Sequence, residues 1–180
     1  MVQKELGTLP FIAEDLGIIT PDVRALLDQF HIPGTRVLQF AFNGDPNNPY
    51  LPHNYSPNSV VYTGTHDNNT TRGWYDALPD DQRRNLWQYL KRPAGQSSET
   101  AASLMRLAWS SVAALTLAPL QDVINLGAEA RMNVPGRAEG NWRWRAAAES
   151  EWAPAFEFLS DLTKTSNRSP AGQSTPLLPR

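Results

Sequence analysis

The chain has 180 residues, of which 41% are hydrophobic, and a formal net charge of −2 at pH 7. This length allows one globular domain with a core, and the slightly acidic balance argues against nucleic acid or an anionic membrane as main partner. The lack of cysteine excludes a disulfide framework and a cysteine metal site. No apolar run approaches the roughly 20 residues that span a bilayer, and the N-terminus lacks a signal-peptide pattern, so we expect a cytoplasmic protein.

The spacing of apolar residues predicts strands that alternate with helices. Pro21 suits the first position of a helix, and Pro33 with Gly34 would end that helix. The expected elements, in chain order, are a strand over 9–13, a helix over 20–32, a strand over 36–42, a loop over 43–58, a strand over 60–63, helices over 78–92 and 97–112, a strand over 115–120, a loop over 131–145 and a helix over 151–162. Residues 165–180 are poor in large apolar side chains, so a disordered tail is predicted there.

This order of elements defines the fold class. Buried strands that alternate with helices predict an α/β protein with a parallel sheet covered on both faces. Two architectures fit: a complete small doubly wound domain, or half of a (β/α)8 barrel, which normally needs about 250 residues. Composition alone favours the doubly wound domain, because that fold requires no further segment.

Two of the predicted strands end in carboxylates. Glu14 follows the first strand, and Asp67 follows the third, directly after His66. The carboxyl ends of parallel strands form the active edge in either architecture, and two carboxylates are the minimum equipment for cleaving a glycosidic bond. A carboxylate after a strand can equally cap a loop or a helix. Asp15 points to the opposite side of its strand from Glu14, so we expect it to be structural.

The histidines and tryptophans allow several interpretations. His66 could shuttle a proton, hydrogen-bond a substrate hydroxyl or serve a structural role. A metal site would need His53, His66 and Asp67, which lack a tight ligand spacing such as HExxH, so no metal is expected. Trp142 and Trp144 alternate on a two-residue period, which predicts both indoles on one side of an extended segment. They would either stack on a sugar or pack against the last helix.

Other chemistries lack their motifs in this sequence. A serine nucleophile would need a GxSxG elbow, which the chain does not contain. A nucleotide-binding α/β domain would need a GxxxxGK[ST] or GxGxxG run after a strand, and neither occurs. The carboxylates at the strand ends therefore remain the leading candidates for chemistry.

Several runs of the sequence resemble a known family. The resemblance is carried, in this order, by IAEDLGIITPDV, RVLQFAF, NPYLPHNY, VVYTGTHDNNTTRGWY, LAPLQDV and MNVPG…GNWRWR. These runs resemble the C-terminal part of the 4-α-glucanotransferases, glycoside hydrolase family 77, over about residues 6–162. The resemblance implies that residues 1–164 form the C-terminal half, strands five to eight, of a (β/α)8 barrel. It also implies transfer of α-1,4-glucan segments between maltooligosaccharides or to glucose, by a retaining double displacement without a cofactor.

The resemblance further implies roles for individual residues. Glu14 corresponds to the general acid/base of the family. Asp67 corresponds to a third carboxylate, which binds the sugar at the cleavage point and stabilises the oxocarbenium-like transition state. His66 would hydrogen-bond the same sugar. The other substrate-binding residues that the resemblance implies are Asn68, Asn133, His53 and Asn54.

The nucleophile of the family is the residue that this chain is expected to lack. In the family pattern it is an aspartate on the strand before the acid/base strand, a segment that would precede Met1. Asp45 lies in a predicted loop and Asp122 belongs to the PLQDV motif, so neither replaces it. We therefore expect a chain that is inactive alone, and that is marginal, aggregation-prone or dependent on a partner such as the N-terminal half of the barrel. The alternative is a non-catalytic remnant or a weak glucan-binding module.

Overall fold

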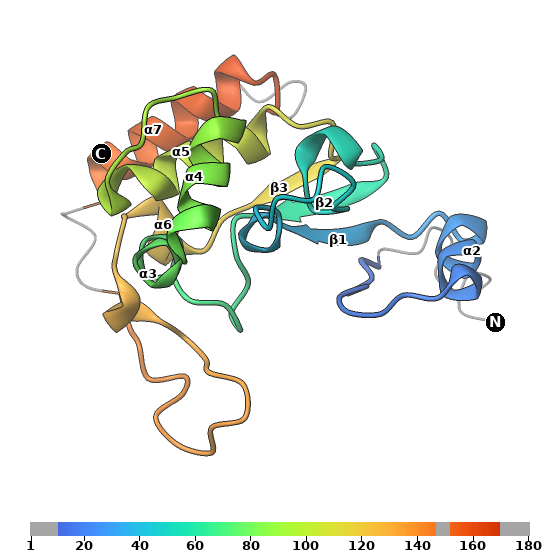
Figure 1. Ribbon diagram of the computed structural model, residues 1–180, viewed down its shortest axis with the longest axis horizontal. Coiled ribbons are helices and arrows are strands. Elements are labelled where there is room, and N and C mark those ends of the chain that lie inside the picture. Colours follow the sequence, from blue (N-terminus) through green and yellow to red (C-terminus); the bar gives the residue numbers. More distant parts are fainter. Residues whose placement is uncertain (1–10, 147–151, 170–180) are drawn as a thin grey trace.

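The centre of the fold is a three-stranded parallel sheet with the strand order β1–β2–β3 (Figure 1). The computed structural model describes residues 11–146 and 152–169. The strands are β1 (Gly34–Val37), β2 (Ser59–Tyr62) and β3 (Leu115–Leu117). Gly34 pairs with Ser59, and Val60 pairs with Leu115. An isolated parallel bridge joins Ala13 to Gly34, so segments from successive parts of the chain lie side by side in chain order.

The helices divide into a cluster and one outlier. They are α2 (Pro21–Gln29), α3 (Thr71–Ala77), α4 (Asp80–Tyr89), α5 (Ser97–Trp109), α6 (Leu120–Val123) and α7 (Ala153–Thr165). Short 3-10 turns are η1 (Leu38–Phe40), η2 (Pro52–Asn54) and η3 (Ala128–Ala130). In Figure 1, α3 to α7 gather at one end of the sheet and α2 lies at the other. Within the described residues, no helix has the length and hydrophobicity of a membrane span.

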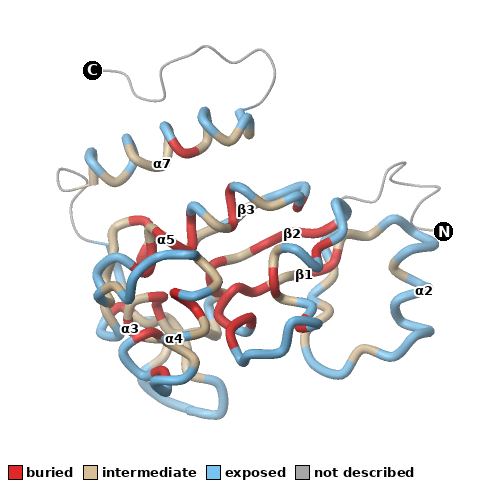
Figure 2. Tube along the Cα trace, turned by 45° about the horizontal axis from the view of Figure 1, so that its top comes forward, coloured by how far each residue is buried: buried red, intermediate tan, exposed pale blue. Residues whose placement is uncertain are grey.

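The hydrophobic core lies between the sheet and the clustered helices. Val61 of β2, Leu86 of α4 and Leu104 of α5 are fully buried in one apolar cluster. Each such side chain contributes about 1.5–3 kcal/mol relative to an exposed one. The Trp87 indole donates a hydrogen bond of 2.8 Å to the Tyr75 hydroxyl, which satisfies both polar groups inside the core. Figure 2 shows that the buried residues are concentrated here, whereas α2 is largely exposed.

Local signals explain where the clustered helices begin. The backbone N–H of Gln96, just before α5, donates to the Glu99 carboxylate at 2.9 Å, as in a capping box. The Thr70 hydroxyl, just before α3, accepts a hydrogen bond of 3.1 Å from the Gly73 N–H. Such caps satisfy backbone donors that lack partners inside the helix. The Thr70 cap therefore fixes the start of α3 directly after the loop that follows β2.

The structure confirms the α/β class and most of the predicted elements. The strand predicted over 60–63 is β2, and the helices predicted over 20–32, 78–92, 97–112 and 151–162 are α2, α4, α5 and α7. The strand predicted over 115–120 is shorter, because α6 begins at Leu120. The predicted tail overlaps the described chain at 165–169, where Arg168 donates hydrogen bonds to the carbonyls of Trp109, Ser111 and Ala113. The remainder of that tail, 170–180, lies outside the described residues.

Two strand predictions were wrong in extent. The strand predicted over 36–42 ends at Val37, because the chain turns into η1 and the Asn48 side chain binds the Phe40 carbonyl at 2.8 Å. In the described part of the strand predicted over 9–13, only Ala13 pairs with the sheet. The extended segment predicted around Trp142 is also wrong, because Trp142 has a φ of 63° and lies in a turn.

Candidate active site

A cavity of about 470 Å³ lies at the carboxyl ends of the strands. Its wall is formed by residues that follow three elements of the sheet. Glu14 follows the bridge at Ala13. The residues after β2 are Gly64, Thr65, His66 and Asn68, and those after β3 are Ala118, Pro119 and Gln121. Tyr62, the last residue of β2, also lines the cavity. Burial raises the pKa of the Tyr62 hydroxyl, and the nearby charge of Glu14 raises it further. The cavity therefore brings Glu14 close to the end of β2 at the carboxyl edge of the sheet, although β1 lies between the bridge at Ala13 and β2.

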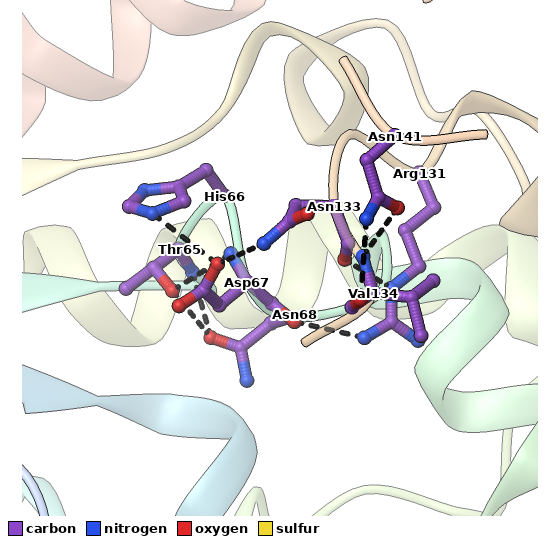
Figure 3. Close-up of polar contacts among 8 residues, drawn as sticks. All are labelled: Thr65, His66, Asp67, Asn68, Arg131, Asn133, Val134 and Asn141. Atoms are coloured by element: carbon purple, nitrogen blue, oxygen red, sulfur yellow. Dashed lines mark hydrogen bonds and ion pairs between the residues drawn. The ribbon is translucent and has the colours of Figure 1, made fainter. Parts of the chain in front are cut away.

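Asp67 is held between two of the predicted site residues. Its carboxylate oxygen Oδ1 lies 3.3 Å from Nε2 of His66 and accepts a hydrogen bond of 2.6 Å from Nδ2 of Asn133. Figure 3 shows Asp67 between these two side chains. The side chains of His66 and Asp67 are 55% and 45% exposed, so both are open to a ligand. His66 forms part of the cavity wall, whereas Asp67 and Asn133 are not among its lining residues.

The loop after β2 is shaped by its own side chains. Oδ1 of Asn68 accepts hydrogen bonds from the backbone N–H and the hydroxyl of Thr65, at 2.9 and 2.8 Å. Gly64 packs closely on Gln39, because a Cβ at residue 64 would lie 2.5 Å from the side-chain nitrogen of this buried glutamine and would force it to shift. Asn68 thus lines the cavity and also sets the turn that presents His66 and Asp67.

Arg131 is a site residue that the sequence analysis missed. Its Nη2 donates to the backbone carbonyl of Asp67 at 2.8 Å, and its Nε donates to the carbonyl of Asn133 at 2.8 Å (Figure 3). The guanidinium therefore ties the loop after β2 to the segment that carries Asn133. A cation two residues before a predicted site residue was the available signal. Asn141 organises the same segment by accepting a hydrogen bond of 2.9 Å from the Val134 N–H.

The structure does not bring His53 and Asn54 to the cavity. The ring nitrogens of His53 lie 3.0 Å from the Tyr89 hydroxyl and 3.1 Å from the Pro46 carbonyl. Nδ2 of Asn54 donates to the carbonyls of Pro46 and Asn48, each at 2.9 Å. Both side chains hold the long loop together, and neither lines the cavity at the strand ends.

Asp15 has the structural role that its position predicts. Its carboxylate accepts hydrogen bonds from the Thr35 N–H at 2.5 Å and from Nη1 of Arg36 at 3.0 Å. These contacts fasten the residues after the bridge at Ala13 to β1. Glu14 is thereby placed on the cavity side, because adjacent side chains of an extended chain point in opposite directions. No cluster of three potential metal ligands occurs among residues 11–146 and 152–169.

The fold and the site define an α/β protein with carboxylates at the carboxyl edge of a parallel sheet, the edge at which α/β enzymes hold their active sites. A family model described as 4-alpha-glucanotransferase, that of glycoside hydrolase family 77, matches residues 1–150. The chain belongs to this family.

Relatives and a solved structure agree with this assignment. The chain is 54% identical over 164 residues to a 4-alpha-glucanotransferase of Synechocystis sp., covering 88% of this chain and 32% of the relative. It is 50% identical over 149 residues to a 4-alpha-glucanotransferase of Thermus thermophilus, covering 80% of this chain and 30% of the relative. The amylomaltase from Streptococcus agalactiae in complex with acarbose superposes with a TM-score of 0.87 at 32% identity, covering 94% of this chain and 34% of that one. The chain thus spans about a third of the length of these relatives.

Proposed function

We propose that this chain forms strands five to eight of a 4-α-glucanotransferase barrel and supplies two of its three active-site carboxylates. The observation that carries the proposal is the meeting of two strand ends at one cavity, with Glu14 from one end and His66, whose ring lies 3.3 Å from the Asp67 carboxylate, from the other. Its substrates are α-1,4-glucans and glucose, and its partner is the remainder of the barrel. The cytoplasmic location predicted from the sequence stays a prediction.

In the proposed reaction Glu14 acts twice. As a carboxylic acid it protonates the glycosidic oxygen while the family's aspartate nucleophile attacks C1 and forms a glycosyl ester. As a carboxylate it then takes the proton from the acceptor hydroxyl, whose oxygen attacks C1 and releases the aspartate. Retention requires the acid/base and nucleophile carboxyls to stand about 5–5.5 Å apart. The nucleophile belongs to the strand before the one that carries Glu14, outside these 180 residues.

The proposed role of Asp67 is electrostatic. Positive charge develops at the sugar ring in the transition state, and a fixed carboxylate nearby stabilises it. Asn133 donates to Oδ1 of Asp67, and Arg131 holds its backbone, so the carboxylate does not have to reorient during the reaction. His66, which is half exposed beside the same oxygen, is placed to donate to a sugar hydroxyl.

The test uses the Synechocystis relative with its matching third replaced by this chain. We expect the graft to convert maltotriose to glucose and longer oligosaccharides. Glu14→Gln should lower its kcat by about 10²–10⁴-fold, the contribution of general acid–base catalysis. Asp67→Asn should lower kcat by about 10²–10³-fold, as when one electrostatic stabiliser is lost. Asp28→Asn, at an exposed position of α2, is the matched control and should leave kcat unchanged.

The isolated 180-residue chain separates the two candidate functions. Without the nucleophile it should give no turnover of maltotriose, and clear turnover would overturn the proposed division of the site. Binding of acarbose or maltotriose by isothermal titration would show a glucan-binding module. An active graft in which Glu14→Gln and Asp67→Asn have no effect would refute the assigned roles.

A further inference from the structure

Asp122 is a buried carboxylate that the proposed reaction does not use. It is 1% exposed and lies on α6. Its Oδ2 accepts hydrogen bonds from the hydroxyls of Thr63 and Thr71 at 2.5 and 2.6 Å, and its Oδ1 accepts one of 2.7 Å from the Thr71 N–H. Burying a carboxylate is costly unless donors compensate it. These contacts therefore indicate what the group does in the fold.

The two residues that bind Asp122 bracket the loop that carries the candidate site. Thr63 directly follows β2, and Thr71 is the first residue of α3. Between them lie residues 64–70, which include His66 and Asp67. A single side chain thus joins the two ends of this loop and fixes the distance between them.

The base of the loop is fixed from the β1 side as well. The buried side chain of Gln39 donates to the Asn69 carbonyl at 2.9 Å. Gly64 passes so close to Gln39 that an added Cβ would lie 2.5 Å from its nitrogen. The loop therefore has little room to shift toward η1. Because both ends of the loop are held, the short chain between them determines the position of Asp67. Arg131 donates a hydrogen bond to the Asp67 carbonyl at this position.

We propose that Asp122 is a positioning residue, which sets the place of His66 and Asp67 by joining both ends of the loop that carries them. The significance of Asp67 for sugar transfer rests on the proposed function. The geometric coupling from Asp122 to the Asp67–Asn133 contact does not rest on that function. An experiment can therefore refute either proposal without refuting the other.

Three variants of the 180-residue chain test the coupling. Asp122→Ala removes all three hydrogen bonds. Asp122→Asn keeps the shape and one acceptor for the Thr71 N–H, and its amide can donate to the hydroxyl oxygens, so it should rescue the position. Leu104→Ala opens a cavity in the core at α5, where Leu104 is fully buried. It is the control for a loss of stability that does not act through the loop.

The readout is the side-chain amide signal of Asn133 in ¹⁵N NMR spectra, identified by its loss in Asn133→Ala. This amide donates to Asp67, so its chemical shift reports the contact directly. In Asp122→Ala we expect the signal to move to the position of a free asparagine side chain. Amide exchange over 65–71 should also accelerate by about tenfold or more relative to α5, because the loop opens locally. Asp122→Asn should keep the wild-type signal.

Each outcome decides the proposal. An unmoved Asn133 signal in Asp122→Ala, or an equal movement in Leu104→Ala, would show a merely structural role and overturn it. If Asp122→Ala does not fold, Thr63→Val removes one of the three donors, and the Asn133 signal of that variant decides instead. Acarbose added to the wild-type chain tests the proposed function separately, because the Asn133 signal responds to Asp122 whether or not the sugar binds.

Discussion

At the scale of single residues, the candidate site depends on hydrogen bonds that hold a carboxylate still. Asn133 and Arg131 come from a segment far from Asp67 in the sequence, and both bind it, one at the side chain and one at the backbone. A hydrogen bond to a charged group contributes about 1.5–3 kcal/mol. Its loss at a site that stabilises a transition state should therefore appear mainly in kcat.

Replacement of Asn133 by alanine tests this contribution. In the grafted enzyme described above, Asn133→Ala should lower kcat by about tenfold to a hundredfold, the equivalent of one hydrogen bond to a charged group. The change in KM should be smaller, because the positive charge that Asp67 stabilises develops only in the transition state. Steady-state kinetics with maltotriose measure both constants. A raised KM with unchanged kcat would contradict a role for Asn133 in the transition state.

The buried carboxyl of Asp122 predicts a pH dependence of stability. Burial raises its pKa above the ordinary value of 3.8, and the donors from Thr63 and Thr71 oppose this rise. Between 3.8 and the raised value, the folded protein binds a proton that the unfolded chain has lost, so the free energy of unfolding falls as the pH rises through this window. Asp122→Asn removes this slope. Urea unfolding at several pH values above 4 should show the wild type losing stability relative to Asp122→Asn, whereas parallel curves would contradict the prediction.

At the scale of secondary-structure elements, the position of α3 depends on one close contact. Gly73 in α3 faces Ala128 of η3, and a Cβ at residue 73 would lie 2.8 Å from the Ala128 Cα. The absence of a side chain therefore lets α3 approach the turn that leads to Arg131. The site residues in the loop before α3 and those in the segment after η3 are therefore positioned by the same packing contact.

A substitution at Gly73 separates helix propensity from packing. Gly73→Ala gains about 1 kcal/mol in helix propensity, but overpacking against backbone costs about 1–3 kcal/mol. Because the contact is with backbone, we expect the packing cost to win and the free energy of unfolding to fall by up to about 2 kcal/mol. Urea unfolding measures the change. Gln88→Ala on an exposed position of α4 is the control, and a gain of stability in Gly73→Ala would show that η3 moves away freely.

The elements that the sequence predicted are those specified by local signals. The helices α4 and α5 carry apolar residues at helical spacing between clear start and stop signals, and β2 is an apolar run that ends in polar residues. Helix α3 was missed because its seven residues contain a glycine and no periodic apolar pattern. Its cap at Thr70 and its packing against Ala128 are tertiary features, which periodicity does not reveal.

Local signals in the sequence predicted only part of the candidate site. Glu14, His66 and Asp67 stand at strand ends, which the chain order alone brings to one edge. The contact of Asp67 with Asn133 joins distant segments, and the resemblance to a family, not the periodicity, pointed to Asn133. Arg131 was missed because its position two residues before Asn133 does not reveal that its side chain contacts the backbone of Asp67. His53 has no such contact with the cavity, because the fold of its own loop engages both ring nitrogens.

At the scale of the whole molecule, the sheet leaves apolar side chains uncovered within the described residues. On β3, Leu115 and Leu117 are 45% and 37% exposed, although strands of a parallel sheet are normally buried on both faces. The apolar residues of α2 are also uncovered, with Leu26 53% exposed, and α2 buries none of its residues (Figure 2). Leaving one large apolar side chain exposed forfeits about 1.5–3 kcal/mol. A few such residues therefore amount to much of the 5–15 kcal/mol by which a typical domain is stable.

The isolated 180-residue chain should consequently be marginal and prone to associate. We expect a broad thermal transition in circular dichroism and an apparent mass that rises with concentration in sedimentation velocity, since an open strand edge recruits further strands. The double substitution Leu115→Lys with Leu117→Lys should reduce this association, because charge on an edge strand blocks pairing. In the Synechocystis graft, where the rest of the barrel covers the edge, the same pair should instead lower the melting temperature, because it buries charge. A sharp, cooperative melt of a monomer well above room temperature, in the isolated chain, would contradict the proposal that further residues complete the barrel.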